Sequence, residues 1–195
     1  MKKLLLLGLL AIVGYGLFGA ASFYIGKYMD YWERSWAYSR DEKAVLLVGK
    51  WEGSFKDPDG IDKEIKLEIL VPETDSERWD KAFKKTTHRF ANTKRNFEGL
   101  ATVTSKLGTE YYELSGKVNE DDNREIYLNF HPDEKKKKVL PNFLLTESND
   151  AKWDINTITF LANFTYHKAN DTALYESSNP KHKMKIKVNL QRVQF

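Results

Sequence analysis

Residues 49–71 read GKWEGSFKDPDGIDKEIKLEILV, and apolar and polar residues alternate on both sides of a turn. Before the turn, Trp51, Gly53 and Phe55 share one face. The turn follows from Asp57-Pro58-Asp59-Gly60, because proline presets φ and glycine accepts a positive φ. After it, every second residue is again apolar, from Ile65 to Val71. The segment therefore predicts a β-hairpin with one buried face.

The rest of the domain repeats this period of two. Six further segments alternate in the same way: 97–104, 111–118, 124–130, a weaker 139–146, 157–167 and 183–195. Turn-type residues separate them, including those at 148–150. Eight consecutive strands with mostly short links predict an all-β fold over residues 46–195. We expect an antiparallel up-and-down eight-stranded β-barrel, with a β-sandwich as the alternative.

One segment between the second and third strands has helical periodicity. Thr74 and Glu77 have capping-box spacing, and aromatic residues recur at helical intervals among basic ones. This predicts a short basic amphipathic helix that either packs over the barrel end, forms a lid, or rests on a membrane surface. The residues assigned to the lid or membrane-surface role are Trp79, Phe83, Lys84, Lys85, Arg89 and Phe90.

The N-terminus has the pattern of a membrane-targeting element. A basic start, residues 1–3, precedes 22 uncharged residues, 4–25, which suit a transmembrane span of about 20 residues. Residues 26–45 form an aromatic juxtamembrane linker or helix, typical of the headgroup level. We expect an uncleaved single-pass anchor; the alternative is a signal peptide cleaved near Ala21 and a secreted protein.

The location of the domain follows from the short Lys2-Lys3 tail, which favours the cytoplasmic side, although basic residues on the two sides of the span are balanced. We therefore expect a bacterial inner-membrane protein with its C-terminal domain in the periplasm. The chain has no cysteine, so neither a disulfide nor a lipid-modified cysteine holds it.

Charge argues against a nucleic-acid partner. The net charge is +3, but five basic and two acidic residues lie in residues 1–40. Removing these leaves 26 of each sign in residues 41–195, so the domain is neutral and lacks the basic surface that nucleic-acid binding needs.

Catalytic and metal-binding signatures are lacking in the sequence. The four histidines, His88, His131, His167 and His182, are scattered, and no nucleophile elbow, phosphate loop or zinc spacing occurs. The Gly14–Gly19 match to a dinucleotide fingerprint lies inside the apolar span. We therefore expect no enzyme activity, no metal and no cofactor.

Gly49-Lys50-Trp51 at the start of the first strand resembles the G-x-W motif of the lipocalins and the wider calycin group. In that group the tryptophan plugs the closed end of the barrel and an arginine from near the last strand packs across it. Arg192 is the matching residue here, and it falls in phase with inward-facing Val188 and Leu190. The resemblance implies that Trp51 and Arg192 close one end of the barrel.

Two functions follow from these features. The first is a membrane-anchored lipocalin-like protein that holds a lipid or another hydrophobic or amphipathic small molecule. The second is an envelope protein-interaction module, such as an assembly, immunity or inhibitor protein, with a filled interior and no small ligand. The inward residues predicted to contact a ligand are Phe55, Leu67, Tyr112, Leu114, Phe130, Phe160, Phe164, Tyr166 and Ile186.

Overall fold

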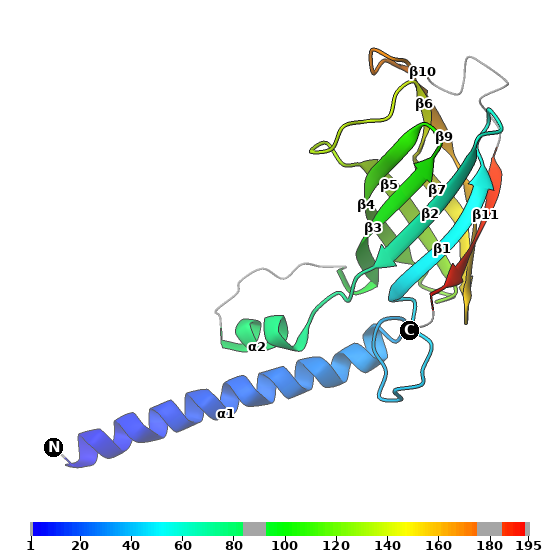
Figure 1. The fold of residues 1–195 in the computed structure, drawn as a ribbon. Helices are drawn as coiled ribbons and strands as arrows, with labels where there is room; N and C mark the ends of the chain where they lie inside the picture. The colour runs from blue at the N-terminus through cyan, green and yellow to red at the C-terminus, as the bar shows by residue number, and fades with distance from the viewer. Residues whose placement is uncertain (1, 84–92, 175–184, 194–195) are drawn as a thin grey trace.

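The structure, a computed structural model, describes residues 2–83, 93–174 and 185–193. Eight antiparallel strands form a closed barrel (Figure 1) in the order β1-β11-β8-β7-β5-β4-β3-β2, which confirms the predicted fold class. The barrel strands are β1 Gly49–Lys56, β2 Asp62–Ile69, β3 Asn96–Ser105, β4 Gly108–Val118, β5 Glu125–Pro132, β7 Glu147–Asp154, β8 Thr157–Ala162 and β11 Ile186–Arg192.

The sixth barrel strand differs from the prediction. Residues 148–150, expected to form a turn, lie within β7, which pairs with β5 and β8. Backbone pairing holds this strand although two of its buried residues, Ser148 and Ala151, are small, and Trp153 is the one large apolar residue that packs against the core, so its apolar alternation is weak. The register between β5 and β7 also shifts between Ile126 and Leu128.

The segment expected as the sixth strand leaves the barrel. β6 Asn142–Leu145 pairs with β9 Phe164–His167, and β9 pairs with β10 Ala173–Leu174, in a separate three-stranded sheet. The predicted strand 157–167 is thus two strands, divided at Asn163. All four residues of β6 are buried, which explains why this segment lacks a clear period of two. Figure 1 shows the small sheet at the end of the barrel away from the N-terminal helix.

In the described part of the chain, two α-helices lie outside the barrel. α1 Lys2–Glu33 is long and apolar enough to cross a membrane, and it continues eight residues past the predicted end of the span at residue 25. α2 Asp75–Phe83 begins with the predicted capping box, in which the Thr74 amide donates to Glu77 Oε2 at 2.8 Å and the Glu77 amide donates to Thr74 Oγ1 at 3.3 Å. A short 3₁₀ helix, η1 Thr93–Arg95, precedes β3. In Figure 1, α1 projects away from the barrel and α2 runs beside α1.

The core is inside the barrel. Burial alternates along the strands, and the inward side chains form one apolar cluster that also includes Trp36 and Leu47 from the segment between α1 and β1. The segment that leads from α1 into β1 is therefore part of the core. The barrel interior and the two ends of the barrel are the first places to look for a functional site.

Candidate functional site

The barrel interior contains the residues predicted to contact a ligand. Seven of the nine are buried, and the remaining two, Tyr166 and Ile186, are partly buried and pack against the same cluster. Ring centroids lie 5.8 Å apart for Phe55 and Phe164, and 5.9 Å apart for Phe130 and Phe160. The interior is therefore lined by side chains that contact one another, as in small barrels with a side-chain core.

A polar side chain on β7, that of Ser148, interrupts the apolar middle of the barrel. Ser148 is fully buried on β7, and its hydroxyl has no hydrogen-bond partner among the described residues. A buried hydroxyl without a partner is unfavourable by about 1–3 kcal/mol. It marks a point of the described interior where a polar atom of water or of a ligand would gain a hydrogen bond; Trp36 Nε1 and Asp57 Oδ2, toward the two ends, are likewise buried without a hydrogen-bond partner.

The end of the barrel nearest α1 is closed by Trp51. Its indole is 1% exposed and donates to the Leu47 carbonyl at 3.1 Å. The Arg192 guanidinium lies 4.2 Å from the Trp51 ring centroid and donates to the Val48 carbonyl at 3.2 Å and to that of Leu46. Burial lowers the pKa of Arg192, although an arginine stays protonated at any ordinary pH.

The backbone geometry at this end of the barrel explains why the first residue of the G-x-W motif is a glycine. Gly49 has φ +133°, a conformation that other residues rarely adopt, and a Cβ there would lie 2.9 Å from Arg192 Nη1. The glycine therefore lets the backbone approach the arginine that covers Trp51.

The opposite end is closed by charge. Lys63, 1% exposed, donates from Nζ to Glu110 Oε1 at 2.8 Å, to Asn142 Oδ1 at 2.9 Å and to the Phe143 carbonyl at 2.8 Å. Asp57 Oδ2 lies 3.8 Å from the same nitrogen. Two carboxylates thus face one ammonium, and the network joins β2, β4 and β6.

Tyr112 extends this network toward the interior. Its hydroxyl donates to Glu110 Oε2 and accepts from the Leu145 amide at 3.2 Å. Burial raises the pKa of Tyr112 well above its usual value, and the nearby Glu110 carboxylate raises it further. The cleft beside Glu110 and Tyr112 has a volume of only about 10 Å³, barely enough for one water molecule.

Sequence reasoning missed the Lys63 network, although a signal was present. Lys63 is in phase with Ile65 and Leu67, and Glu110 is in phase with Tyr112 and Leu114. Opposite charges on the inward faces of two strands of one barrel indicate a buried ion pair, because a buried charge needs a partner.

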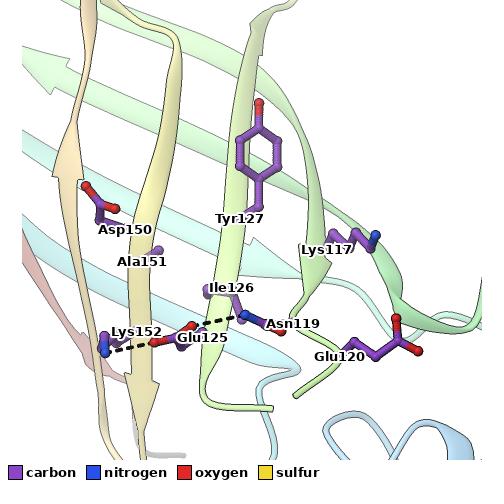
Figure 2. Close-up of a pocket in the computed structure, with 9 residues that line it drawn as sticks. All are labelled: Lys117, Asn119, Glu120, Glu125, Ile126, Tyr127, Asp150, Ala151 and Lys152. Carbon is purple, nitrogen blue, oxygen red and sulfur yellow. Dashed lines mark hydrogen bonds and ion pairs between the residues drawn. The ribbon is translucent and has the colours of Figure 1, made fainter. Parts of the chain in front are cut away.

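The outer wall has a shallow groove of about 510 Å³ over β4, β5 and β7 (Figure 2). Glu125 accepts from Lys152 at 2.9 Å and from Asn119 Nδ2 at 3.0 Å. Figure 2 shows these three side chains in a row across the groove, with Lys117 on its other side. Paired charges of both signs suit a polar protein surface better than an apolar small molecule.

Of the residues predicted to form a lid or membrane-surface helix, those that the structure describes do not lie over the barrel. Trp79 and Phe83 lie on α2 and pack beside α1, not over the barrel end. Lys84, Lys85, Arg89 and Phe90 lie outside the described residues. Within the described ranges, no group of three histidine, aspartate or glutamate side chains has the arrangement of a metal site.

No protein-family model matches the chain, and no curated protein matches it. A solved structure that is similar belongs to a de novo designed protein, a fluorescence-activating beta barrel. The sequences are 12% identical, the match covers 75% of this chain and 93% of the designed one, and the TM-score is 0.41.

Proposed function

We propose that this protein is a membrane-tethered interaction module that works through the outside of a filled β-barrel. The observation that supports this most strongly is the interior: aromatic side chains contact one another inside the barrel, Trp51 closes one end and the Lys63 network closes the other. Because the protein's own side chains fill the interior, we expect a partner to bind to the outer wall of the barrel. The proposal assigns no catalytic activity to the chain.

The tether in this proposal is α1. Its apolar side chains are exposed along most of the helix, from Leu6 to Ile25, which suits acyl chains as the surrounding solvent. Tyr28 and Trp32 are also exposed at the barrel-proximal end, where aromatic side chains favour headgroups. We place the anchor in a bacterial inner membrane and the barrel on the periplasmic side, with an envelope protein as its partner.

Photo-crosslinking tests this function. A benzoylphenylalanine replaces Tyr127 in the groove or Leu100 on the outer face of β3, both in the full chain in its own membrane. We expect a discrete polypeptide adduct from at least one of these positions and none from Leu107 at the opposite end. Absence of protein adducts from the outer wall, with a small molecule retained by the purified chain, would overturn the proposal.

A second function, a carrier of one small hydrophobic molecule, is favoured by the unpartnered Ser148 hydroxyl. The contact between Arg192 and Trp51 also supports this function, because the lipocalin group has such a pair at the closed end of its barrel. A carrier that uses this hydroxyl would bind a fluorescent fatty acid several-fold more weakly as Ser148→Ala. The outward-facing control Ser115→Ala would leave binding unchanged, and equal binding by all three proteins would exclude Ser148 as a ligand contact.

A further inference from the structure

The segment that follows α1 loops back beside the end of that helix (Figure 1), where Arg40 meets two of its tyrosines. The Arg40 guanidinium lies 4.5 Å from the ring centroid of Tyr28 and 5.3 Å from that of Tyr31. We infer that Arg40, held against these two rings, binds the phosphate of a phospholipid headgroup at the surface of the bilayer. This inference rests on the proposed anchoring of α1 and adds a specific lipid contact to it.

The position of the two tyrosines along α1 places this cation at the depth of the lipid phosphates. At about 1.5 Å per residue, the apolar run 4–25 extends over about 33 Å, close to the hydrocarbon thickness of about 30 Å. The Cα atom of Tyr28 then lies about 5 Å beyond the hydrocarbon boundary, and that of Tyr31 about 9 Å beyond it. Because a headgroup layer is about 5–8 Å thick on each side, the two rings lie at the level of the headgroups.

The turn after α1 brings Arg40 to this level. A helix continued from residue 25 to Arg40 would place that residue about 22 Å beyond the hydrocarbon boundary, in water. Instead the helix stops, the Ala37 amide donates to the Arg34 carbonyl at 2.8 Å, and the buried Trp36 fixes the turn in the barrel core. Arg40 therefore lies beside Tyr28, which is twelve positions earlier in the chain.

Two other cations beside this part of α1 are already paired with carboxylates. Lys27 forms an ion pair with Asp75 at 2.6 Å, and Arg78 forms one with Asp30 at 2.6 Å. Arg40 is exposed and forms no ion pair with any carboxylate of the described residues. Its charge is therefore available to an anion from outside the chain.

The contact with the rings leaves the guanidinium able to bind such an anion. An arginine over an aromatic face keeps its N–H donors in the guanidinium plane, where two of them match two oxygens of a phosphate. Tyr28 is 50% exposed and Trp32, one turn further along α1, is 76% exposed, so a lipid can reach this side of the helix. Aromatic side chains of this kind favour the headgroup layer. The rings therefore hold the cation where phosphate oxygens occur.

The residues next to Arg40 indicate which headgroups are compatible with the site. Asp41 and Glu42 are exposed and acidic, and Lys43 is exposed and basic, so residues 40–43 have no net charge. Asp41 Oδ1 accepts the Lys43 amide at 2.9 Å. A neutral segment gains little from the overall negative potential of an anionic membrane. The group that the site recognises is therefore the phosphate, which zwitterionic and anionic phospholipids share.

Solid-state NMR tests the inference by measuring contact between arginine and lipid phosphorus. The full chain, isotopically labelled at the guanidinium carbon of arginine, is reconstituted in phosphatidylethanolamine–phosphatidylglycerol vesicles in phosphate-free buffer. Rotational-echo double resonance measures how far phosphorus dephases the guanidinium signal. We expect Arg40→Gln to lower the dephased signal by the intensity of one guanidinium out of the seven in the chain.

Three further variants separate the site from general electrostatics. Lys43→Gln removes the same charge from the same segment and should leave the dephased signal unchanged. Tyr28→Leu removes a ring that holds Arg40 and should remove most of the Arg40 contribution. Tyr28→Phe keeps that ring and should retain the contribution.

A bilayer of phosphorus-free galactolipid, with inorganic phosphate in the buffer, distinguishes a lipid phosphate from free phosphate. We expect no Arg40 contribution in this bilayer. A contribution that persists there overturns lipid as the ligand. Equal dephasing of the wild type and Arg40→Gln in phospholipid, or an equal loss in Lys43→Gln, overturns the site.

The anchoring of α1 is measured separately, because the cysteine-free chain accepts a single cysteine probe at Leu17. A fluorophore on this cysteine is quenched by brominated acyl chains only if α1 enters the bilayer. Quenching at Leu17 without an Arg40 contribution to the dephased signal overturns the phosphate site and leaves the anchor standing. Lack of quenching at Leu17 overturns both.

Discussion

The two ends of the barrel are closed by opposite chemistry. Near α1, an indole fills the opening and a guanidinium lies over it, at 4.2 Å, in contact with backbone carbonyls of the incoming chain. At the far end, the Lys63 ammonium is held between the Glu110 carboxylate of β4, the Asn142 amide of β6 and the Asp57 carboxylate of the β1–β2 turn. The near end thus fixes the barrel to the segment that follows its tether, and the far end fixes the small sheet to the barrel.

The two ends are also stabilised by different interactions. The near end is mainly apolar surface with one cation that contacts π electrons and carbonyls, so losing the cation leaves no unpaired carboxylate behind. The far end depends on charge balance in a buried site, where removing one partner leaves the other uncompensated. Substitutions at the far end should therefore have the larger effects.

Lys63→Met should cause the largest loss. It leaves the Glu110 and Asp57 carboxylates buried without a cation, which we expect to lower the free energy of unfolding by about 3–5 kcal/mol. Denaturant unfolding of the full chain in mild detergent, followed by tryptophan fluorescence, measures it. Lys66→Met is the control on the outer face of the same strand, and equal losses for the two variants would contradict the buried network.

Arg192→Met should have the next largest effect. A desolvated cation–π contact contributes about 2 kcal/mol, and the Leu46 and Val48 carbonyls also lose a donor. We expect a loss of about 2–3 kcal/mol together with faster amide exchange around Leu46–Val48 and unchanged exchange in β6. Lys187→Met, on the outer face of the same strand, should change neither the stability nor the amide exchange. Equally faster exchange at both ends of the barrel in Arg192→Met would contradict the idea that the two ends are stabilised separately.

Tyr112→Phe should be milder at neutral pH, by about 1–2 kcal/mol, because it removes the hydrogen bonds to Glu110 and Leu145. The pKa of Tyr112 is raised in the folded state, so its contribution is complete below about pH 10 and is lost as the pH rises above the pKa of an unfolded tyrosine. Wild-type stability should therefore fall more steeply above about pH 10 than that of Tyr112→Phe. Tyr111→Phe, exposed on the same strand, should retain the wild-type slope.

Two glycine substitutions give the smallest contrast. Gly60 in the far-end turn has φ +78° and open space where a Cβ would lie, so Gly60→Ala should lose about 1 kcal/mol from backbone strain alone. Gly49→Ala should lose more, because its Cβ also displaces Arg192. Thermal unfolding of both variants measures the difference, and a smaller loss for Gly49→Ala would argue against the close approach at the near end.

The sequence predicted most of the barrel because alternation is a local property. It identified the β1–β2 hairpin, the capping box of α2 and the inward phase of Arg192. It failed at β7, where Ser148 and Ala151 give little apolar signal and pairing with β5 and β8 holds the strand. The docking of Phe83 on Gly19 was also beyond reach, since it depends on a contact between residues 64 positions apart.

Native mass spectrometry of the full chain tests the filled interior most directly. The protein is purified in mild detergent and exchanged into lipid-free detergent, which removes lipid from the surface of α1 but not from a closed barrel. If the interior is filled by side chains, the mass corresponds to the 22.7 kDa chain and any polypeptide partner. A discrete small-molecule excess that survives the exchange and disappears only on unfolding would contradict a filled interior and establish a carrier.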